Sequence, residues 1–361
     1  MKGQGMVVTS FASGPTTLPP EVQEGLAHDV MAWRSSGQSV LALPFTGPEF
    51  TEILDEAERD LRALLHIPSG YRVLFLQGGA FAHFALVALN LGGQHQHADY
   101  VETGLWSRRA VGEARPWIDV RLAARGDGAS LPPPETWQLS PHAAYCHYTS
   151  NETADGLQYH AVPDTGSVPL VGDMSADLMT RPIPVERFGL IYASAQKNFG
   201  AAGLTLVIVR DDLLGRARPG TPAPFDYTRQ AKERSRVNTP ATFAIWVASR
   251  MLRWLLDAGG LESAEERSRR KSARLYAAIA DGGFYNAPAA ERDRSLVSVR
   301  FHLPTRELEG MFLDEATERN LLYLGGHPSV GGIRANLYNG VPESAVDALV
   351  AFMGDFQRRR G

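Results

Sequence analysis

An aspartate and a lysine each stand close behind a short apolar segment of the sequence. Asp173 follows the segment 169–172, and Lys197 stands four residues after the segment 190–193 ends. Apolar segments of this length predict buried strands, and ligands of open α/β sheets bind beyond the carboxyl ends of the strands. A lysine amine can bond covalently to a carbonyl carbon, and a carboxylate can hold a ring nitrogen in its protonated form. The pair therefore points to a cofactor with an aldehyde and a pyridine ring.

A glycine-rich turn follows a third apolar segment, 71–76. It includes Gly79, Ala80 and Phe81 and precedes an apolar helical stretch. Backbone N–H groups at the start of a helix can bind a phosphate, although a tight turn without a ligand has the same composition. Together with Lys197 and Asp173, the turn meets the three requirements of pyridoxal 5'-phosphate (PLP). Taken separately, the aspartate could cap a helix and the lysine could lie at the surface.

A sheet covered by helices is needed to place these residues at one edge. Helical periodicity follows Pro19 and recurs over 50–65. Strand-sized apolar segments lie at 71–76, 143–146, 169–171, 190–193 and 204–209. We therefore expect an α/β protein whose large domain, 16–262, holds a mostly parallel sheet with helices on both faces. Residues 263–361 alternate strand and helix and predict a small α+β domain, against which residues 1–15 should pack.

Composition excludes several classes of protein. The 361 residues are 44% hydrophobic and 21% charged, which is typical of a globular chain. A net charge of -4 gives no basic excess for nucleic acid. The single cysteine, Cys146, rules out an internal disulfide and a cysteine-based zinc cluster, and we expect it to be a small core residue in a reducing compartment.

Targeting and metal binding leave no signature in the sequence. The first ten residues lack the apolar stretch of a signal peptide. Every apolar segment is far shorter than the ~20 residues that span a bilayer. We therefore expect a cytoplasmic protein without a membrane or nucleic-acid partner. His95 and His97 are expected in an exposed loop rather than at a metal.

Five segments together carry a resemblance to a known family. They are 13–19, 151–156 (Asn-Glu-Thr-Ala-Asp-Gly), 195–205 around Lys197, 238–240 (Asn-Thr-Pro) and 331–339 (Gly-Gly-Ile-Arg-Ala-Asn-Leu-Tyr-Asn). With them the chain resembles the phosphoserine aminotransferases over essentially its full length. These are class-V, fold-type-I, PLP-dependent homodimers of amino-acid biosynthesis. The resemblance implies that Lys197 carries the cofactor covalently and that Asp173 pairs with its pyridine nitrogen.

The resemblance also implies the remaining contacts. Trp106 would stack on the cofactor ring, and Thr153 would contact the side of the ring that carries its hydroxyl group. Arg334 would bind the substrate α-carboxylate, with Ser13 nearby, and a planar guanidinium suits that task. The cofactor phosphate would be held by the turn residues Gly79, Ala80 and Phe81, by Gln196, and by Asn238 and Thr239 of the partner subunit.

The chain lacks the family's arginines at three places where the substrate phosphate would bind. Phe45 and Thr46 stand in place of a His-Arg pair, Phe81 replaces an arginine of the glycine turn, and His327 and Pro328 replace a second His-Arg pair. Charge-assisted hydrogen bonds to a phosphate contribute about 1.5–3 kcal/mol each. A dianion beside phenylalanine would also lose its hydration without compensation. We therefore expect an unphosphorylated α-amino or α-keto acid substrate with a neutral or apolar side chain.

Alternatives remain open at this stage. His83, Arg108, Arg109 or His327 could rebuild an anion site, which would make the chain a genuine phosphoserine:2-oxoglutarate aminotransferase of serine biosynthesis. The arginine replaced by Thr46 also serves glutamate, so another amino acid could be the donor. The same cofactor could instead support a lyase, decarboxylase or replacement reaction. A binding protein without catalysis is a further alternative.

Overall fold

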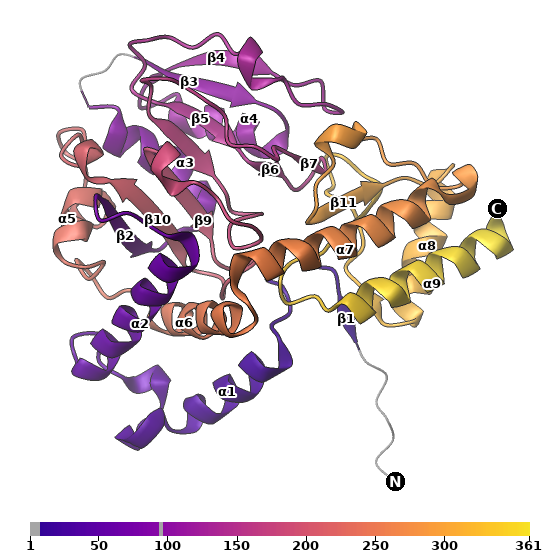
Figure 1. The fold of residues 1–361 in the computed structure, drawn as a ribbon, viewed down its shortest axis with the longest axis horizontal. Helices are drawn as coiled ribbons and strands as arrows, with labels where there is room; N and C mark the ends of the chain where they lie inside the picture. Colours follow the sequence, from indigo (N-terminus) through magenta and orange to yellow (C-terminus); the bar gives the residue numbers. More distant parts are fainter. Residues whose placement is uncertain (1–7, 94–96) are drawn as a thin grey trace.

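A seven-stranded sheet forms the centre of the larger part of the molecule, with a smaller unit beside it (Figure 1). The structure is a computed structural model that describes residues 8–93 and 97–361. The strand order is β2-β10-β9-β8-β5-β3-β4. The strands of this sheet are β2 (Tyr71–Leu76), β3 (His97–Glu102), β4 (Asp119–Arg125), β5 (Cys146–Thr149), β8 (Leu170–Asp173), β9 (Leu190–Ser194) and β10 (Thr205–Arg210).

The sheet is mostly parallel, and β10 runs antiparallel to both its neighbours, β2 and β9. This confirms the predicted fold class. Register brings the ends of several strands to one edge, because Leu76 and Ser194 both lie opposite Thr205, while Asp173 lies opposite Tyr192 and Thr149. The residues that follow β2, β5, β8 and β9 therefore meet at that edge.

Helices cover both faces of the sheet, as the apolar strands require. On one face pack α3 (Gly79–Leu91) and α4 (Leu105–Ala114). The other face is covered by α2 (Pro48–Leu65) and α6 (Thr242–Asp257), with α1 (Pro20–Met31) at its margin. The expected apolar stripe of α2 is buried from Phe50 to Leu65. A short helix, α5 (Tyr227–Lys232), lies beside β2.

The smaller unit has its own core and is linked to the larger part by one long helix. Its elements are α7 (Gly260–Ala280), β11 (Ser298–Phe301), α8 (Arg306–Glu318), β12 (Leu321–Leu322), β13 (Ile333–Asn336) and α9 (Glu343–Arg360), and β1 (Thr9–Ser10) pairs with β12. Leu261 of α7 belongs to the main core, whereas Leu275 and Ile279 belong to the core of the small unit. The change of core therefore falls within α7, whose first turn contains the predicted boundary.

Three predictions of local structure differ from the observed fold. The strand predicted over 143–146 begins only at Cys146, which is buried as expected. Sequence analysis missed β3 and β4, because both mix polar with apolar residues. His97 is not in an exposed loop, since it is buried in β3 with its Nε2 2.7 Å from the Ser140 hydroxyl. His95 lies outside the described residues.

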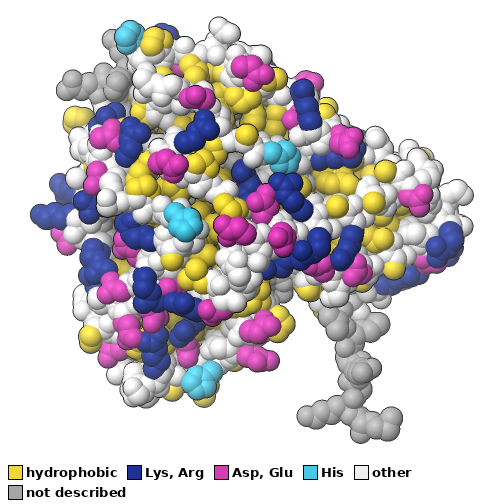
Figure 2. Space-filling model, viewed as in Figure 1, with side chains coloured by type: hydrophobic (Ala, Val, Ile, Leu, Met, Phe, Trp, Pro, Cys, Tyr) yellow, Lys and Arg dark blue, Asp and Glu magenta, His cyan; other side chains and the backbone are white. Residues whose placement is uncertain are grey.

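Surface charge is mixed on the face shown in Figure 2, where basic and acidic side chains are interspersed. Among residues 8–93 and 97–361, the structure contains no helix of the length and apolarity needed to cross a membrane. The same residues contain no cluster of three or more side chains suited to a metal ion.

Candidate active site

A cavity of about 340 Å³ lies at the edge of the sheet where β5, β8 and β9 end. Ligand pockets are commonly about 300 Å³ or larger. The cavity brings together residues that sequence analysis singled out from six separate segments of the chain. They are Ser13, Gly79, Ala80, Phe81, Trp106, Thr153, Asp173, Gln196 and Lys197.

Asp173 is the last residue of β8 and is buried. Its Oδ1 atom accepts a hydrogen bond from the Ser175 backbone N–H at 3.0 Å. Burial raises the pKa of Asp173, while the hydrogen bonds from Ser175 and the charge of Lys197 lower it. A buried carboxylate is stabilised by a cationic partner, and a protonated ring nitrogen is such a partner.

Lys197 lies in the turn after β9, and its Nζ atom is 5.7 Å from the centre of the Trp106 ring. Burial lowers the pKa of Lys197 to about 8; the carboxylate of Asp173 opposes this shift and the guanidinium of Arg334 adds to it. The neutral amine is the form that attacks a carbonyl carbon. Burial therefore favours the neutral, nucleophilic form of this amine.

Thr153 connects Trp106 to Arg334. The Trp106 Nε1 atom donates to the Thr153 hydroxyl at 2.7 Å, and the Arg334 Nη1 atom donates to the Thr153 carbonyl at 3.1 Å. Arg334 is buried on β13 beside the cavity lining, and burial lowers its pKa. Its Nε atom is buried without a hydrogen-bond partner among the described residues. Such a guanidinium retains donors for a carboxylate.

The glycine turn presents the start of α3 to the cavity. Gly78 and Gly79 have φ values of 104° and 67°, and a Cβ atom on Gly78 would lie 2.6 Å from that of Ala82. Glycine is therefore required there. Gly78, the residue before α3, has no side chain to cap the helix, and the Ala80 N–H donates to the Ser194 hydroxyl at 2.7 Å. This helix start can hold a phosphate through its N–H groups and its positive dipole end.

Comparison with known proteins identifies the family that carries this arrangement. Residues 8–349 match the family described as aminotransferase class-V. The chain belongs to the class-V aminotransferases. It is 49% identical over 360 residues to the phosphoserine aminotransferase of Laribacter hongkongensis, covering 99% of this chain and 100% of that one. A phosphoserine aminotransferase of Acidithiobacillus ferrooxidans is 47% identical, with 98% and 99% covered.

Solved structures agree with the sequence relatives of this class-V aminotransferase. The phosphoserine aminotransferase from Bacillus circulans subsp. alkalophilus superposes with a TM-score of 0.95 at 41% identity, covering 97% of this chain and 98% of that one. The PLP-bound phosphoserine aminotransferase from Trichomonas vaginalis has a TM-score of 0.93 at 37% identity, with 96% and 100% covered. The protein is thus a PLP-dependent transaminase, as predicted.

Two further side chains of the class-V site support the fit to PLP. The Thr149 hydroxyl and the Gln196 Oε1 atom are buried without hydrogen-bond partners in the described part of the chain, and both residues line the cavity. A polar ligand would satisfy them. Thr149 and Ser194 were not assigned to the site from sequence. Their position directly at strand ends, like that of Asp173, is the signal that could have found them.

The structure does not bring every predicted residue of the aminotransferase to this cavity. Asn238 and Thr239 are exposed and lie outside its lining, and Gln77 Nε2 donates to the Thr239 carbonyl at 2.9 Å. Phe45 and Thr46 lie in the loop before α2, also outside the lining. Residues of one chain therefore form only part of the predicted site.

The basic residues considered for a rebuilt anion site differ in their placement. His327 lies near the cavity, with its ring centre 6.3 Å from that of Trp106, and Pro328 beside it is exposed. Arg109 places its guanidinium carbon 5.1 Å from the same Trp106 ring. His83 cannot contribute, because it is fully buried and burial lowers its pKa to about 3.

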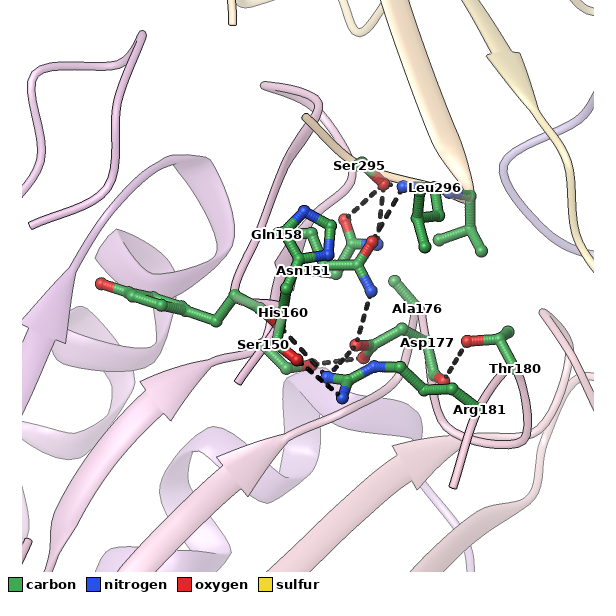
Figure 3. Close-up of polar contacts among 12 residues, drawn as sticks. Ser150, Asn151, Gln158, His160, Ala176, Asp177, Thr180, Arg181, Ser295 and Leu296 are labelled. Carbon is green, nitrogen blue, oxygen red and sulfur yellow. Dashed lines mark hydrogen bonds and ion pairs between the residues drawn. The ribbon is translucent and has the colours of Figure 1, made fainter. Parts of the chain in front are cut away.

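A buried polar network supports the hairpin that carries Thr153 (Figure 3). This hairpin, 151–158, is formed by β6 (Asn151–Glu152) and β7 (Leu157–Gln158). Asp177 accepts a hydrogen bond from Gln158 Nε2 at 3.2 Å and pairs with Arg181 at 3.6 Å. The other end of the Gln158 amide, Oε1, accepts from the Leu296 N–H at 2.8 Å. The small unit is therefore tied to the hairpin.

Proposed function

We propose that this aminotransferase acts on an unphosphorylated α-amino or α-keto acid with a neutral or apolar side chain. The observation that carries the proposal is Phe81, which lines the cavity where the resemblance places an arginine. Its side chain is half exposed and meets Phe84 edge to face, with ring centres 5.7 Å apart. A phosphate at this wall would lose its hydration to an aromatic ring without gaining a charged partner.

The residues around the cavity divide the chemistry among them. PLP, when bound, supplies a ring that delocalises the electron pair left on the substrate Cα atom. We assign Lys197 as the covalent attachment point and as the general base that takes the proton from Cα. Asp173 keeps the ring nitrogen protonated. Lys197 and Asp173 are thus the catalytic residues of the proposal.

Four further residues orient the reactants. Trp106 offers a flat face to the ring, and its hydrogen bond to Thr153 restrains the indole plane. Arg334, which lies beside the cavity and donates to the Thr153 carbonyl, would bind the substrate α-carboxylate, and Ser13 lines the cavity. Holding the carboxylate and the ring together sets the angle of the Cα–H bond, which selects that bond for cleavage. Thr153 would also contact the hydroxyl side of the ring.

A second copy of the chain completes the cofactor site in this proposal. The N–H groups of the turn 79–81 other than that of Ala80, which donates to Ser194, and the side chain of Gln196 would hold the cofactor phosphate from one chain. Asn238 and Thr239 are exposed and outside that chain's own cavity, so we assign them to the cavity of the partner in a homodimer.

The wall of the cavity that would face the substrate side chain also requires residues from a second copy of the chain. Phe45 and Thr46 lie outside this chain's own cavity lining, so we assign them to the wall of the partner's cavity. His327 and Pro328 would close the remaining side next to Trp106, where the ring of His327 already lies. With Phe81, this wall presents two phenylalanines and a proline to the substrate side chain. It therefore favours apolar groups.

A second candidate, a genuine phosphoserine:2-oxoglutarate aminotransferase, is favoured by two observations. Relatives of that name are 47–49% identical along the whole chain. Arg109 and His327 both lie near the Trp106 ring, where they could face an anionic side chain. In that case Arg109 would replace part of the lost arginine set.

Steady-state selectivity distinguishes the two candidates. The purified holoenzyme is assayed with O-phosphoserine, glutamate and a series of neutral amino acids, and kcat/KM is compared. We expect at least one neutral or apolar amino acid to exceed O-phosphoserine by ~100-fold or more, the effect of one to two lost charge-assisted bonds. Efficient and selective turnover of O-phosphoserine would overturn the proposal in favour of the second candidate.

Subunit complementation tests the shared site. Lys197→Ala and Asn238→Ala damage different chains of one active site, so a mixed dimer contains one site with both residues intact. Random exchange of the two inactive variants should restore about one quarter of wild-type activity. If each site uses residues of a single chain only, the mixture stays as inactive as its components.

A further inference from the structure

Two buried carboxylates hold the first turn of α4, the helix that carries Trp106. The Trp106 and Ser107 N–H groups donate to Oε2 and Oε1 of Glu152, each at 2.8 Å. The preceding N–H, that of Leu105, donates to the Asp155 Oδ2 atom at 3.1 Å. Three successive N–H groups at the positive end of the helix thus meet negative side chains of one hairpin.

The approach between this hairpin and the helix is close. Glu152 is 1% exposed. A Cβ atom on Gly104, the residue before α4, would lie 2.7 Å from the Glu152 Cδ atom. The tight fit leaves the carboxylate of Glu152 little freedom to move. Any side chain at position 104 would push the carboxylates of both Glu152 and Asp155 away from the helix.

Adjacent residues of the hairpin hold two different parts of Trp106. Glu152 holds its backbone N–H, and the next residue, Thr153, accepts the hydrogen bond from its indole Nε1 atom at 2.7 Å. The position of the ring therefore depends on the hairpin at both ends of the side chain. We propose that Glu152 is a positioning residue that fixes the Trp106 ring against the bound cofactor.

Hydrogen bonds from the helix offset part of what burial costs the charged form of Glu152. Burial raises the pKa of Glu152 to about 7, while hydrogen bonds from Ser107 oppose that rise. A second carboxylate, Asp155, stands beside it, and the charges of Arg300 and Arg108 oppose the rise that burial causes in the pKa of Asp155. Removing the Glu152 carboxylate from water costs free energy, and helix N–H groups that donate to both of its oxygens hold it in place.

The variant Glu152→Gln tests the proposal, which rests on the proposed placement of the cofactor beside Trp106. The amide keeps one acceptor oxygen but turns an N–H₂ donor toward one of the two helix N–H groups. We expect the visible circular dichroism of the bound cofactor to change and its dissociation constant to rise about tenfold. The double variant with Trp106→Phe should bind the cofactor no more weakly than Trp106→Phe alone, because coupled residues are not additive.

The matched control is Asp226→Asn. Asp226 caps α5 in the same way, with its Oδ1 atom accepting from the N–H groups of Thr228 and Arg229 at 2.8 and 3.3 Å. The Asp226→Asn substitution should lower the melting temperature and leave the cofactor spectrum unchanged. If Glu152→Gln is poorly folded, Gly104→Ala serves as a second variant, since its Cβ atom would displace Glu152 and Asp155 together without altering either carboxylate; Gly104→Ala should change the spectrum in the same direction.

The outcomes separate this inference from the proposed function. An unchanged spectrum in Trp106→Phe would contradict the placement of the cofactor beside the indole. A changed spectrum in Trp106→Phe but not in Glu152→Gln or Gly104→Ala, with cofactor affinity retained, would overturn the positioning role alone. Additive losses of affinity in the double variant would also overturn it.

Discussion

The amine of Lys197 lies 5.7 Å from the centre of the Trp106 ring, in a cavity that Asp173 also lines. These three residues follow or belong to three different elements, β9, α4 and β8. An amine for covalent attachment, a flat apolar face and a carboxylate for a ring nitrogen thus share one space. Each of the following predictions alters one feature of this arrangement or of its support.

Removal of the amine should abolish catalysis. Lys197→Ala removes both the covalent attachment point and the proposed general base, and general bases contribute about 10²–10⁴-fold to rate. We expect at least that loss in kcat, and borohydride should no longer fix the cofactor to the protein, as mass spectrometry of the intact chain would report. The exposed Lys232, changed to Ala, is the control and should retain both properties. Full activity of Lys197→Ala would refute the catalytic assignment.

The rate of cofactor attachment should depend on pH with a midpoint well below that of an ordinary lysine. Because burial lowers the pKa of Lys197 to about 8, the reactive neutral amine becomes the major form as the pH rises through 8. The rate at which the apoenzyme binds PLP covalently should therefore rise up to about pH 8 and level off above it. Stopped-flow absorbance measures this rate.

A second variant tests the cause of that midpoint. The Asp173 carboxylate holds the pKa of Lys197 up, so Asp173→Asn should move the midpoint to lower pH. A midpoint near 10.5 in the wild-type protein, the ordinary lysine value that the structure shifts, would show that the amine is not buried in solution.

Restored arginines should shift the substrate preference toward anions. Thr46→Arg, Phe81→Arg and Pro328→Arg each offer a charge-assisted bond worth about 1.5–3 kcal/mol, or about 10–100-fold in kcat/KM for O-phosphoserine relative to a neutral amino acid. Phe225→Arg, at an exposed phenylalanine outside the cavity lining, is the control. If the three variants change selectivity no more than the control, the substrate wall is placed wrongly.

Arg334 should act mainly on substrate binding. Arg334→Lys keeps the charge but loses the planar pair of donors that a carboxylate accepts. We expect KM for amino acids to rise about 10–100-fold with a smaller fall in kcat, as initial-rate kinetics would show. Arg306→Lys at an exposed position on α8 provides the comparison. An unchanged KM would remove Arg334 from the carboxylate site.

The buried Lys271 of α7 should contribute to stability rather than to chemistry. Its Nζ atom donates to the carbonyls of Leu337, Tyr338 and Val341 at 2.7, 2.8 and 3.0 Å. Lys271→Met leaves these carbonyls without that donor and should lower the free energy of unfolding by about 2–4 kcal/mol. Urea denaturation measures the effect, with Lys232→Met as control. Equal stability of the two variants would contradict this account.

Sequence predicted β2, β9 and β10 closely, because these strands are mostly apolar. The segment 71–76 matches β2, and 190–193 and 204–209 match β9 and β10 within one residue at each end. Strands β3 and β4 were missed because they mix polar with apolar residues, and the burial of His97 and Asp99 in β3 depends on packing between segments far apart in the chain. The polarity of an individual residue in the sequence does not indicate whether such packing buries it.

The site residues also differ in how far sequence predicts them, and proximity to an apolar strand is again the deciding feature. Lys197, Asp173 and the glycine turn could be predicted because each follows an apolar strand whose end lies at a shared edge. Trp106 required the resemblance to a family, since a single tryptophan carries no spacing signal. The hydrogen bond between Glu152 and the Trp106 N–H joins residues 46 positions apart, and the motif that contains Glu152 does not reveal it.

A single turnover tests the central claim most directly. Holoenzyme is mixed with one amino acid and no keto acid, and the amine form of the cofactor and the keto acid product are both counted per active site. The account predicts one of each per site with a neutral or apolar amino acid, and little of either with O-phosphoserine at the same concentration. Complete conversion by O-phosphoserine, with none by the neutral amino acids, would contradict it.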